Sequence, residues 1–120
     1  MIECLAITLL ALMVQSEAGG ESFPGKVAVA FVAMNRAEMS GQPIQDVLTR
    51  PKQFKINLRL PIDTDSWAAA QTAYQRRVSD PTYGADHFYA HAVKPRPEWY
   101  NEKYMTIRIG RHTFLKLGGF

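Results

Sequence analysis

Residues 15–21 read Gln15-Ser16-Glu17-Ala18-Gly19-Gly20-Glu21. This stretch follows an apolar segment, residues 2–14, that is good helix material and too apolar to face water. The glycine pair weakens the helix, because glycine adds backbone entropy and tolerates positive φ. Glu17 is therefore expected where a packed helix gives way to an accessible turn. A half-buried carboxylate there has a raised pKa and can act as a general acid; the alternative is a solvated residue at a helix end.

The composition predicts a single domain spanning residues 1–120. Hydrophobic residues make up 47% of the 120 residues and charged residues 21%, as in ordinary globular proteins. The net charge of +3 suits a polyanionic partner. No Lys/Arg cluster alternates with aromatic residues, so a nucleic-acid groove is not expected. The single cysteine, Cys4, allows no intrachain disulfide and is expected to be a small buried side chain of the first helix.

The apolar run at residues 7–14 has some features of a signal peptide. No Lys or Arg precedes it, however, and Glu3 stands where a positive charge is expected. The run is also too short to span a bilayer. We therefore predict a core helix, no clear signal peptide and no membrane partner.

Hydrophobic periodicity predicts helices first and a small sheet afterwards. Helices are expected over residues 2–17, from Ser22 through an apolar stretch at 27–34, over 43–48, and from 63–65 to Arg77. In the third long helix, one apolar face is expected, made of Trp67, Ala70, Tyr74 and Val78. Residues 87–92 alternate like a strand, and residues 105–109 and 112–116 predict a hairpin about Gly110-Arg111. This order indicates an α+β domain.

Six short motifs follow one another along the chain. They are Glu17-Ala18-x-Gly20-Glu21, Gly25-x-Val27-Ala28-Val29-Ala30-x-Val32-x-x-Asn35-Arg36, Gln53-Phe54, Asp80-Pro81-Thr82-x-Gly84-Ala85-x-His87-Phe88-Tyr89, Pro97-x-Trp99 and Thr106-x-x-Ile109-Gly110-x-His112-Thr113-Phe114. In this order and spacing, the series resembles the SleB/CwlJ cell-wall hydrolases, from about Glu3 to Phe114. The resemblance implies a lysozyme-like fold, with a helical core and a small antiparallel sheet near the C-terminus. It also implies that Glu17 is the catalytic acid.

Cleavage of a glycosidic bond requires a proton for the leaving oxygen and, in many hydrolases, a second carboxylate. Glu21 is the nearest candidate for that second carboxylate, with Asp80 and Asp86 as further candidates. Glu21 is alternatively a cap of the second helix, and Asp80 a turn residue. A single acid is sufficient in lytic transglycosylases, and the lack of an obvious second carboxylate favours that route slightly over a muramidase or glucosaminidase.

Polar and aromatic residues of the later motifs are the candidates for substrate binding. We predict sugar contacts from Gln53, His87, Tyr89, Trp99 and His112. The three histidines also suggest a zinc amidase. On a strand, however, His87 and His91 would lie about 13 Å apart, too far to share one ion. No metal and no cofactor are therefore expected.

The chain departs from the family pattern at two positions. Gly19 stands where an arginine is common, and Lys55 stands where a serine is usual. These differences affect substrate contacts rather than the acid. The resemblance implies cleavage of peptidoglycan glycan strands in the bacterial wall, without nucleic-acid partners. It also implies delivery by a phage, either at lysis or in a virion with other virion proteins. The alternative from another class is a non-catalytic glycan-binding or virion structural protein.

Overall fold

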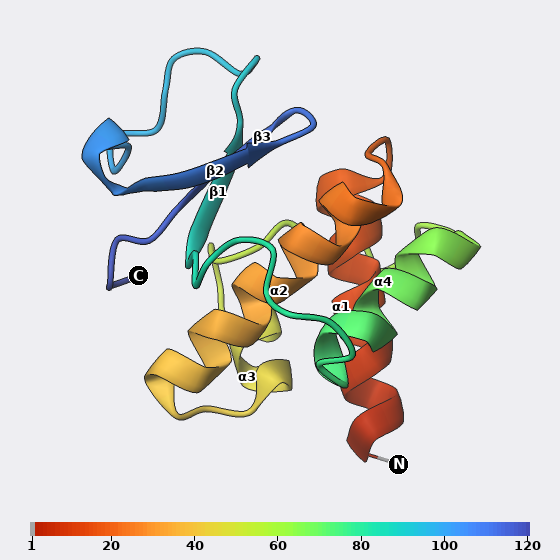
Figure 1. Ribbon diagram of the computed structural model, residues 1–120. Helices are drawn as coiled ribbons and strands as arrows, with labels where there is room; N and C mark the ends of the chain where they lie inside the picture. The colour runs from red at the N-terminus through yellow and green to blue at the C-terminus, as the bar shows by residue number, and fades with distance from the viewer. Residues whose placement is uncertain (1) are drawn as a thin grey trace.

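The computed structural model describes residues 2–120. Its elements in chain order are α1 (Ile2–Ala18), α2 (Phe23–Ser40), α3 (Ile44–Thr49), α4 (Thr64–Tyr74), β1 (His87–Ala90), the 3-10 helix η1 (Glu102–Tyr104), β2 (Met105–Ile109) and β3 (His112–Leu115). The helices lie on one side of the molecule and the sheet on the other (Figure 1). The predicted α+β class, with a small antiparallel sheet near the C-terminus, is confirmed.

The sheet has the strand order β1-β3-β2, and both pairings are antiparallel. The predicted hairpin is present as β2 and β3, and Gly110 in its turn has φ 57°, as a glycine-first turn requires. β1 pairs with β3, so that His87 lies opposite Leu115 and Ala90 opposite His112. β1 stops at Ala90, earlier than predicted, because the Val93 amide donates to the Ala90 carbonyl (2.8 Å) and closes a turn.

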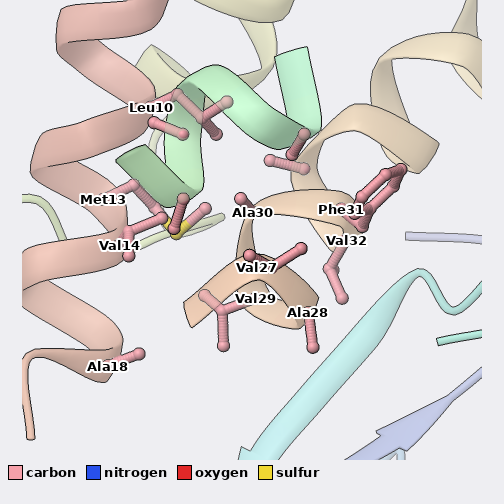
Figure 2. Close-up of a cluster of buried hydrophobic side chains, with 14 of the residues drawn as sticks. Leu10, Met13, Val14, Ala18, Val27, Ala28, Val29, Ala30, Phe31 and Val32 are labelled. Atoms are coloured by element: carbon pink, nitrogen blue, oxygen red, sulfur yellow. The ribbon is translucent and has the colours of Figure 1, made fainter. Parts of the chain in front are cut away.

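Helix α2 forms the centre of the fold, as its apolar sequence predicts. It contacts α1, α3 and α4 and also reaches β1 and β2, and it lies between α1 and the sheet (Figure 1). Leu10, Met13 and Val14 of α1 share one buried cluster with Val29 and Phe31 of α2 (Figure 2). A helix covered on several sides cannot present a polar face, which explains why its sequence is apolar all round.

The first turn of α1 differs from the expectation. Cys4 is exposed rather than buried, and Leu5 is exposed as well. Among the described side chains of α1, burial begins at Ala6. Cys4 is therefore a surface thiol of α1.

Helix α4 is shorter than predicted, and its predicted apolar face is buried only in part: Ala70 lies in the core and Tyr74 packs against it. It ends at Tyr74 because Arg76 adopts φ 50°, and the amides of Arg76 and Arg77 donate to the carbonyls of Ala73 and Thr72. This is a Schellman ending without glycine, so no glycine marks it in the sequence. Its buried side chains are Ser66, Ala69, Ala70 and Ala73. Small residues allow α4 to pack closely on α1 and α2, and they leave Trp67 and Val78 exposed.

An ion pair ties the start of α4 to α2. The buried Lys26 ammonium lies 2.9 Å from Oδ2 of Asp63, the N-cap residue of α4, whose side chain accepts from the Ser66 amide. These partners lower the pKa of Asp63 to about 2. Ser22 precedes α2 as predicted, but its side chain makes no capping hydrogen bond.

A second polar contact joins the turn after α1 to the β2–β3 turn. Oε1 of Glu21 accepts a hydrogen bond from the Arg111 amide at 2.8 Å. Glu21 therefore braces the hairpin and does not cap α2. The contact is close: a Cβ at Gly110 would collide with Oε1 of Glu21. Gly110 is thus required both by its positive φ and by the space that Glu21 fills.

We expect Gly110→Ala to destabilise the fold more than Gly41→Ala. Gly41 also has a positive φ, 67°, but an added Cβ there meets nothing within 4 Å. The control should lose about 1 kcal/mol from the left-handed backbone alone, and Gly110→Ala at least about 1 kcal/mol more from displacing a hydrogen-bonded carboxylate. Urea unfolding of both variants measures this; equal losses would show that the contact with Glu21 contributes nothing.

Candidate active site

A cavity of about 600 Å³ lies between the helices and the sheet and opens to solvent. It is lined by the end of α1, by Arg36 of α2, by residues 52–55, by β1 and by parts of the segment that follows β1. Most of the predicted site residues meet here, namely Glu17, Gln53, His87, Tyr89, Trp99 and His112. Glu21 is not among the lining residues.

Glu17 is half-buried in the last turn of α1. Burial raises the pKa of its carboxyl above the usual value of 4.5. The Lys55 amide and the positive charges of Lys55 and Arg36 oppose this shift in part. Desolvation is the largest of these effects, so the acid keeps its proton to a higher pH than an exposed glutamate does.

Two contacts hold the chain around Glu17. Oγ of Ser16 accepts from the Asn57 amide (2.9 Å), and Oε1 of Gln15 accepts from the Asp63 amide (3.0 Å). They attach the irregular segment before α4 to the end of α1, which brings Lys55 beside the acid. Gly19 is needed in this turn, because an added Cβ would lie 2.6 Å from the Gln15 carbonyl oxygen.

His87 is held by a buried carboxylate. Its Nδ1 lies 2.9 Å from Oδ1 of Asp86, which is fully buried and also accepts from the amides of Leu117 and Gly118. Burial lowers the pKa of His87. The ring packs against Trp99, with centroids 4.6 Å apart. Asp86 is therefore a structural anchor, and not a second carboxylate of the cavity.

Arg36 is a lining residue whose place sequence reasoning missed. It follows the apolar stretch of α2. Its Nε donates to the Asp86 carbonyl (2.7 Å) and its Nη1 to Oε1 of Gln53 (2.8 Å). The guanidinium lies 4.6 Å from the Phe54 ring centroid. Burial lowers its pKa to about 10, so it remains charged and orients Gln53 within the cavity.

Glu21 belongs to an adjoining hollow of about 370 Å³, which shares Glu17, Ala90 and His112 with the main cavity. The Glu21 side chain is only 7% exposed. Its Oε1 lies 3.4 Å from Nδ1 of His112, too poorly aligned for a hydrogen bond. The hydrogen bond from the Arg111 amide, more than any other contact, lowers the pKa of Glu21. An ionised, anchored carboxylate of this kind is poorly suited to proton transfer.

The aromatic residues divide into exposed and packed rings. Trp99 is 38% exposed beside His87, whereas Tyr89 is 7% exposed and meets Tyr100 edge to face, with centroids 5.2 Å apart. Trp99 thus offers a ring face to a ligand, while Tyr89 mainly supports it.

Asp80 is a turn residue, as the alternative interpretation held. Its carboxylate accepts from the amides of Thr82 and Gly84 and from Nδ2 of Asn35. All of these contacts stabilise the turn before β1. Asp80 therefore does not face the acid across the cavity.

Both the sequence and the structure of this chain are similar to those of known proteins. The model of the Cell Wall Hydrolase family matches residues 20–115. This chain belongs to the Cell Wall Hydrolase family. The matched range begins after Glu17, so the family match does not cover that residue. A role for Glu17 is therefore argued from its surroundings in the cavity. Comparison with curated proteins finds no match.

Solved structures of cell-wall hydrolases share this fold. The catalytic domain of the Bacillus cereus SleB protein superposes with a TM-score of 0.79 at 27% identity, covering 92% of this chain and 89% of that one. The catalytic domain of the germination-specific lytic transglycosylase SleB from Bacillus anthracis gives a TM-score of 0.70 at 27% identity, covering 92% and 93%. The resemblance to SleB/CwlJ proteins inferred from the motifs is thereby confirmed.

Two further properties of this cell-wall hydrolase concern metals and membranes. Within residues 2–120, no group of three or more His, Cys, Asp or Glu side chains is arranged to hold a metal ion. His91 lies instead against the Thr113 hydroxyl, with Nδ1 at 3.3 Å. Over the same range, no helix is both long and apolar enough to cross a membrane.

We expect Glu21→Gln to lower the free energy of unfolding by about 1–2 kcal/mol at pH 7, as for loss of a hydrogen bond to a charged group. The folded state lowers the pKa of Glu21 below 4.5. The stabilisation is therefore complete above pH 4.5 and is lost as the pH falls through the folded pKa. Urea unfolding at several pH values should show the two proteins converging in acid, whereas Glu98→Gln, at an exposed position, should match wild type throughout. A difference independent of pH would contradict the ionic role.

Proposed function

We propose that this protein cleaves the glycan strands of peptidoglycan, with Glu17 as its single general acid and base. One observation carries the proposal: among residues 2–120, Glu17 is the one carboxylate that lines the main cavity. Its raised pKa suits a proton donor. The other carboxylates considered, Glu21, Asp80 and Asp86, are each occupied by hydrogen bonds that hold the fold together.

A lytic transglycosylase reaction requires only one acidic residue. Glu17 gives its proton to the glycosidic oxygen, and the C–O bond breaks through an oxocarbenium-like transition state. The resulting carboxylate then accepts the proton of the muramic acid 6-hydroxyl as that oxygen attacks C1. The product is a 1,6-anhydro sugar, and the acid is regenerated with no water consumed. The Bacillus anthracis relative described as a lytic transglycosylase supports this route over a muramidase or glucosaminidase reaction.

The cavity offers groups that suit a sugar chain. The amide of Gln53, oriented by Arg36, can donate to an N-acetyl oxygen, and the exposed face of Trp99 can stack on a pyranose ring. His87 and His112 line the same cavity. This mechanism needs no metal and no organic cofactor. Delivery by a phage, at lysis or in a virion with other virion proteins, stays a prediction from the family resemblance.

We expect Glu17→Gln to reduce cleavage of purified peptidoglycan at least about 100-fold, as for loss of a general acid, while the melting temperature is retained. Glu3→Gln, at an exposed position of the same helix, is the matched control and should act like wild type. Mass spectrometry of the products measures the outcome. Anhydromuramyl ends support the transglycosylase and reducing ends a hydrolase.

Three results of that experiment would overturn the proposal. Wild-type turnover by Glu17→Gln would remove the acid from the mechanism. Free stem peptides would indicate an amidase, and strands left intact by the wild-type protein would indicate a glycan-binding protein.

The rate should fall as the pH rises through the pKa of Glu17, because a general acid works only when protonated. The positive charge of Lys55 lowers that pKa. Lys55→Gln should therefore raise the pKa and move the falling limb of the pH–rate profile to higher pH. Lys103→Gln, on the exposed helix η1, serves as the control with an unmoved limb. A limb that stays in place or moves to lower pH in Lys55→Gln would show that another group sets it.

A further inference from the structure

All four residues of β1 line the main cavity. β1 is an outer strand of the sheet, and the His91 amide donates to the Arg111 carbonyl opposite it. Hydrogen-bonded pairs alternate along an antiparallel ladder, so the backbone groups of Phe88 and Ala90 point away from β3. Both residues line the cavity.

Three backbone groups on this edge are available to a ligand. The Ala90 carbonyl accepts from the Val93 amide. The alternation of the ladder leaves the amide and carbonyl of Phe88 and the amide of Ala90 on the side of β1 that points away from β3. They form a donor, acceptor and donor along one side of an extended strand. An extended peptide presents the complementary groups at the same spacing, which is the basis of strand addition in peptide recognition.

The rim of the cavity adds positive charge. Lys52 and Lys55 line it, both are exposed, and within the described residues neither lies within 4 Å of a carboxylate oxygen. Lys52 sits in a tight turn with φ 65°, which holds its backbone beside the cavity. An extended ligand on the β1 edge therefore meets cations, and an acidic peptide is the complementary partner.

We propose that the β1 edge binds the stem peptide of peptidoglycan, so that this protein selects glycan strands that carry peptides. This inference rests on the proposed function and adds its substrate class. The stem peptide is attached to the muramic acid beside the scissile bond, and it carries free carboxylates and main-chain amides. Phe88 and Ala90 supply main-chain hydrogen bonds, while Lys52 and Lys55 bind the peptide carboxylates.

The first test compares two substrates made from the same wall. Soluble, un-cross-linked strands are used either intact or after an amidase has removed their stem peptides. The wild-type protein should show a kcat/KM at least about tenfold higher on intact strands, as expected from two or three net hydrogen bonds. Equal values on both substrates would overturn the inference and leave the proposed function standing. Cleavage of neither substrate would refute the proposed function itself.

Two variants test whether the preference for strands with stem peptides depends on the β1 edge and on Lys52. Ala90→Pro removes one free amide, and proline is tolerated where an edge strand faces away from its neighbour; the ratio of kcat/KM between the substrates should fall toward one. Lys52→Gln should reduce the ratio and its dependence on salt, whereas Lys103→Gln should leave both as in wild type. If the ratio of kcat/KM between the two substrates is unchanged in both Ala90→Pro and Lys52→Gln, the stem peptide does not bind at the β1 edge.

A measurement on the wild-type protein keeps the test independent of the folding of Ala90→Pro. The free stem tetrapeptide released by the amidase should inhibit cleavage of intact strands. The same peptide with N-methylated amides should not inhibit, because it has lost its main-chain donors and its fit to the strand edge. Equal inhibition by both peptides, or by neither, would contradict binding through the β1 backbone.

Discussion

The hydrogen bond between Glu21 and the Arg111 amide joins the helical part of this molecule to its sheet. Glu21 stands just after α1, and Arg111 stands in the turn between β2 and β3. The anchored hairpin places His112 beside Glu17, and both residues line the main cavity and its neighbour. The position of Glu17 relative to the sheet thus depends on a carboxylate that the Arg111 amide holds in place.

A second buried carboxylate, that of Asp86, holds elements together at the other end of β1. Asp86 collects hydrogen bonds from His87 and from the chain after β3, and its backbone carbonyl accepts from Arg36. Hydrogen bonds to a buried carboxylate offset the cost of its desolvation. At Glu17 the Lys55 amide and the charges of Lys55 and Arg36 offset the burial only in part, and the pKa rises. The proposed role of Glu17 in proton transfer rests on this difference from the two anchored carboxylates.

Much of the fold can be predicted from the sequence where a single local requirement fixes the type of residue. The apolar stretch of α2 predicts a central helix, and Gly110 predicts the hairpin turn, because burial on all sides and a positive φ each demand particular residues. The end of α4 was misplaced, since Arg76 takes a backbone conformation that usually signals glycine. The buried face of α4 was predicted only in part: Ala70 and Tyr74 lie in or against the core, but close helix packing favoured alanines over Trp67.

The candidate site was partly foreseeable. Six of the nine candidate residues named from the sequence line one cavity, but the motif that contains both Glu17 and Glu21 could not separate their roles. Their spacing is short, yet Glu21 turns toward a hairpin about ninety positions later in the chain. Local sequence therefore determined most of the helices and the hairpin, and it indicated Glu17 as the candidate acid. Only the tertiary structure decided which carboxylates are anchored, which strand edge is left free and how Arg36 reaches the cavity, because those properties depend on contacts between distant segments.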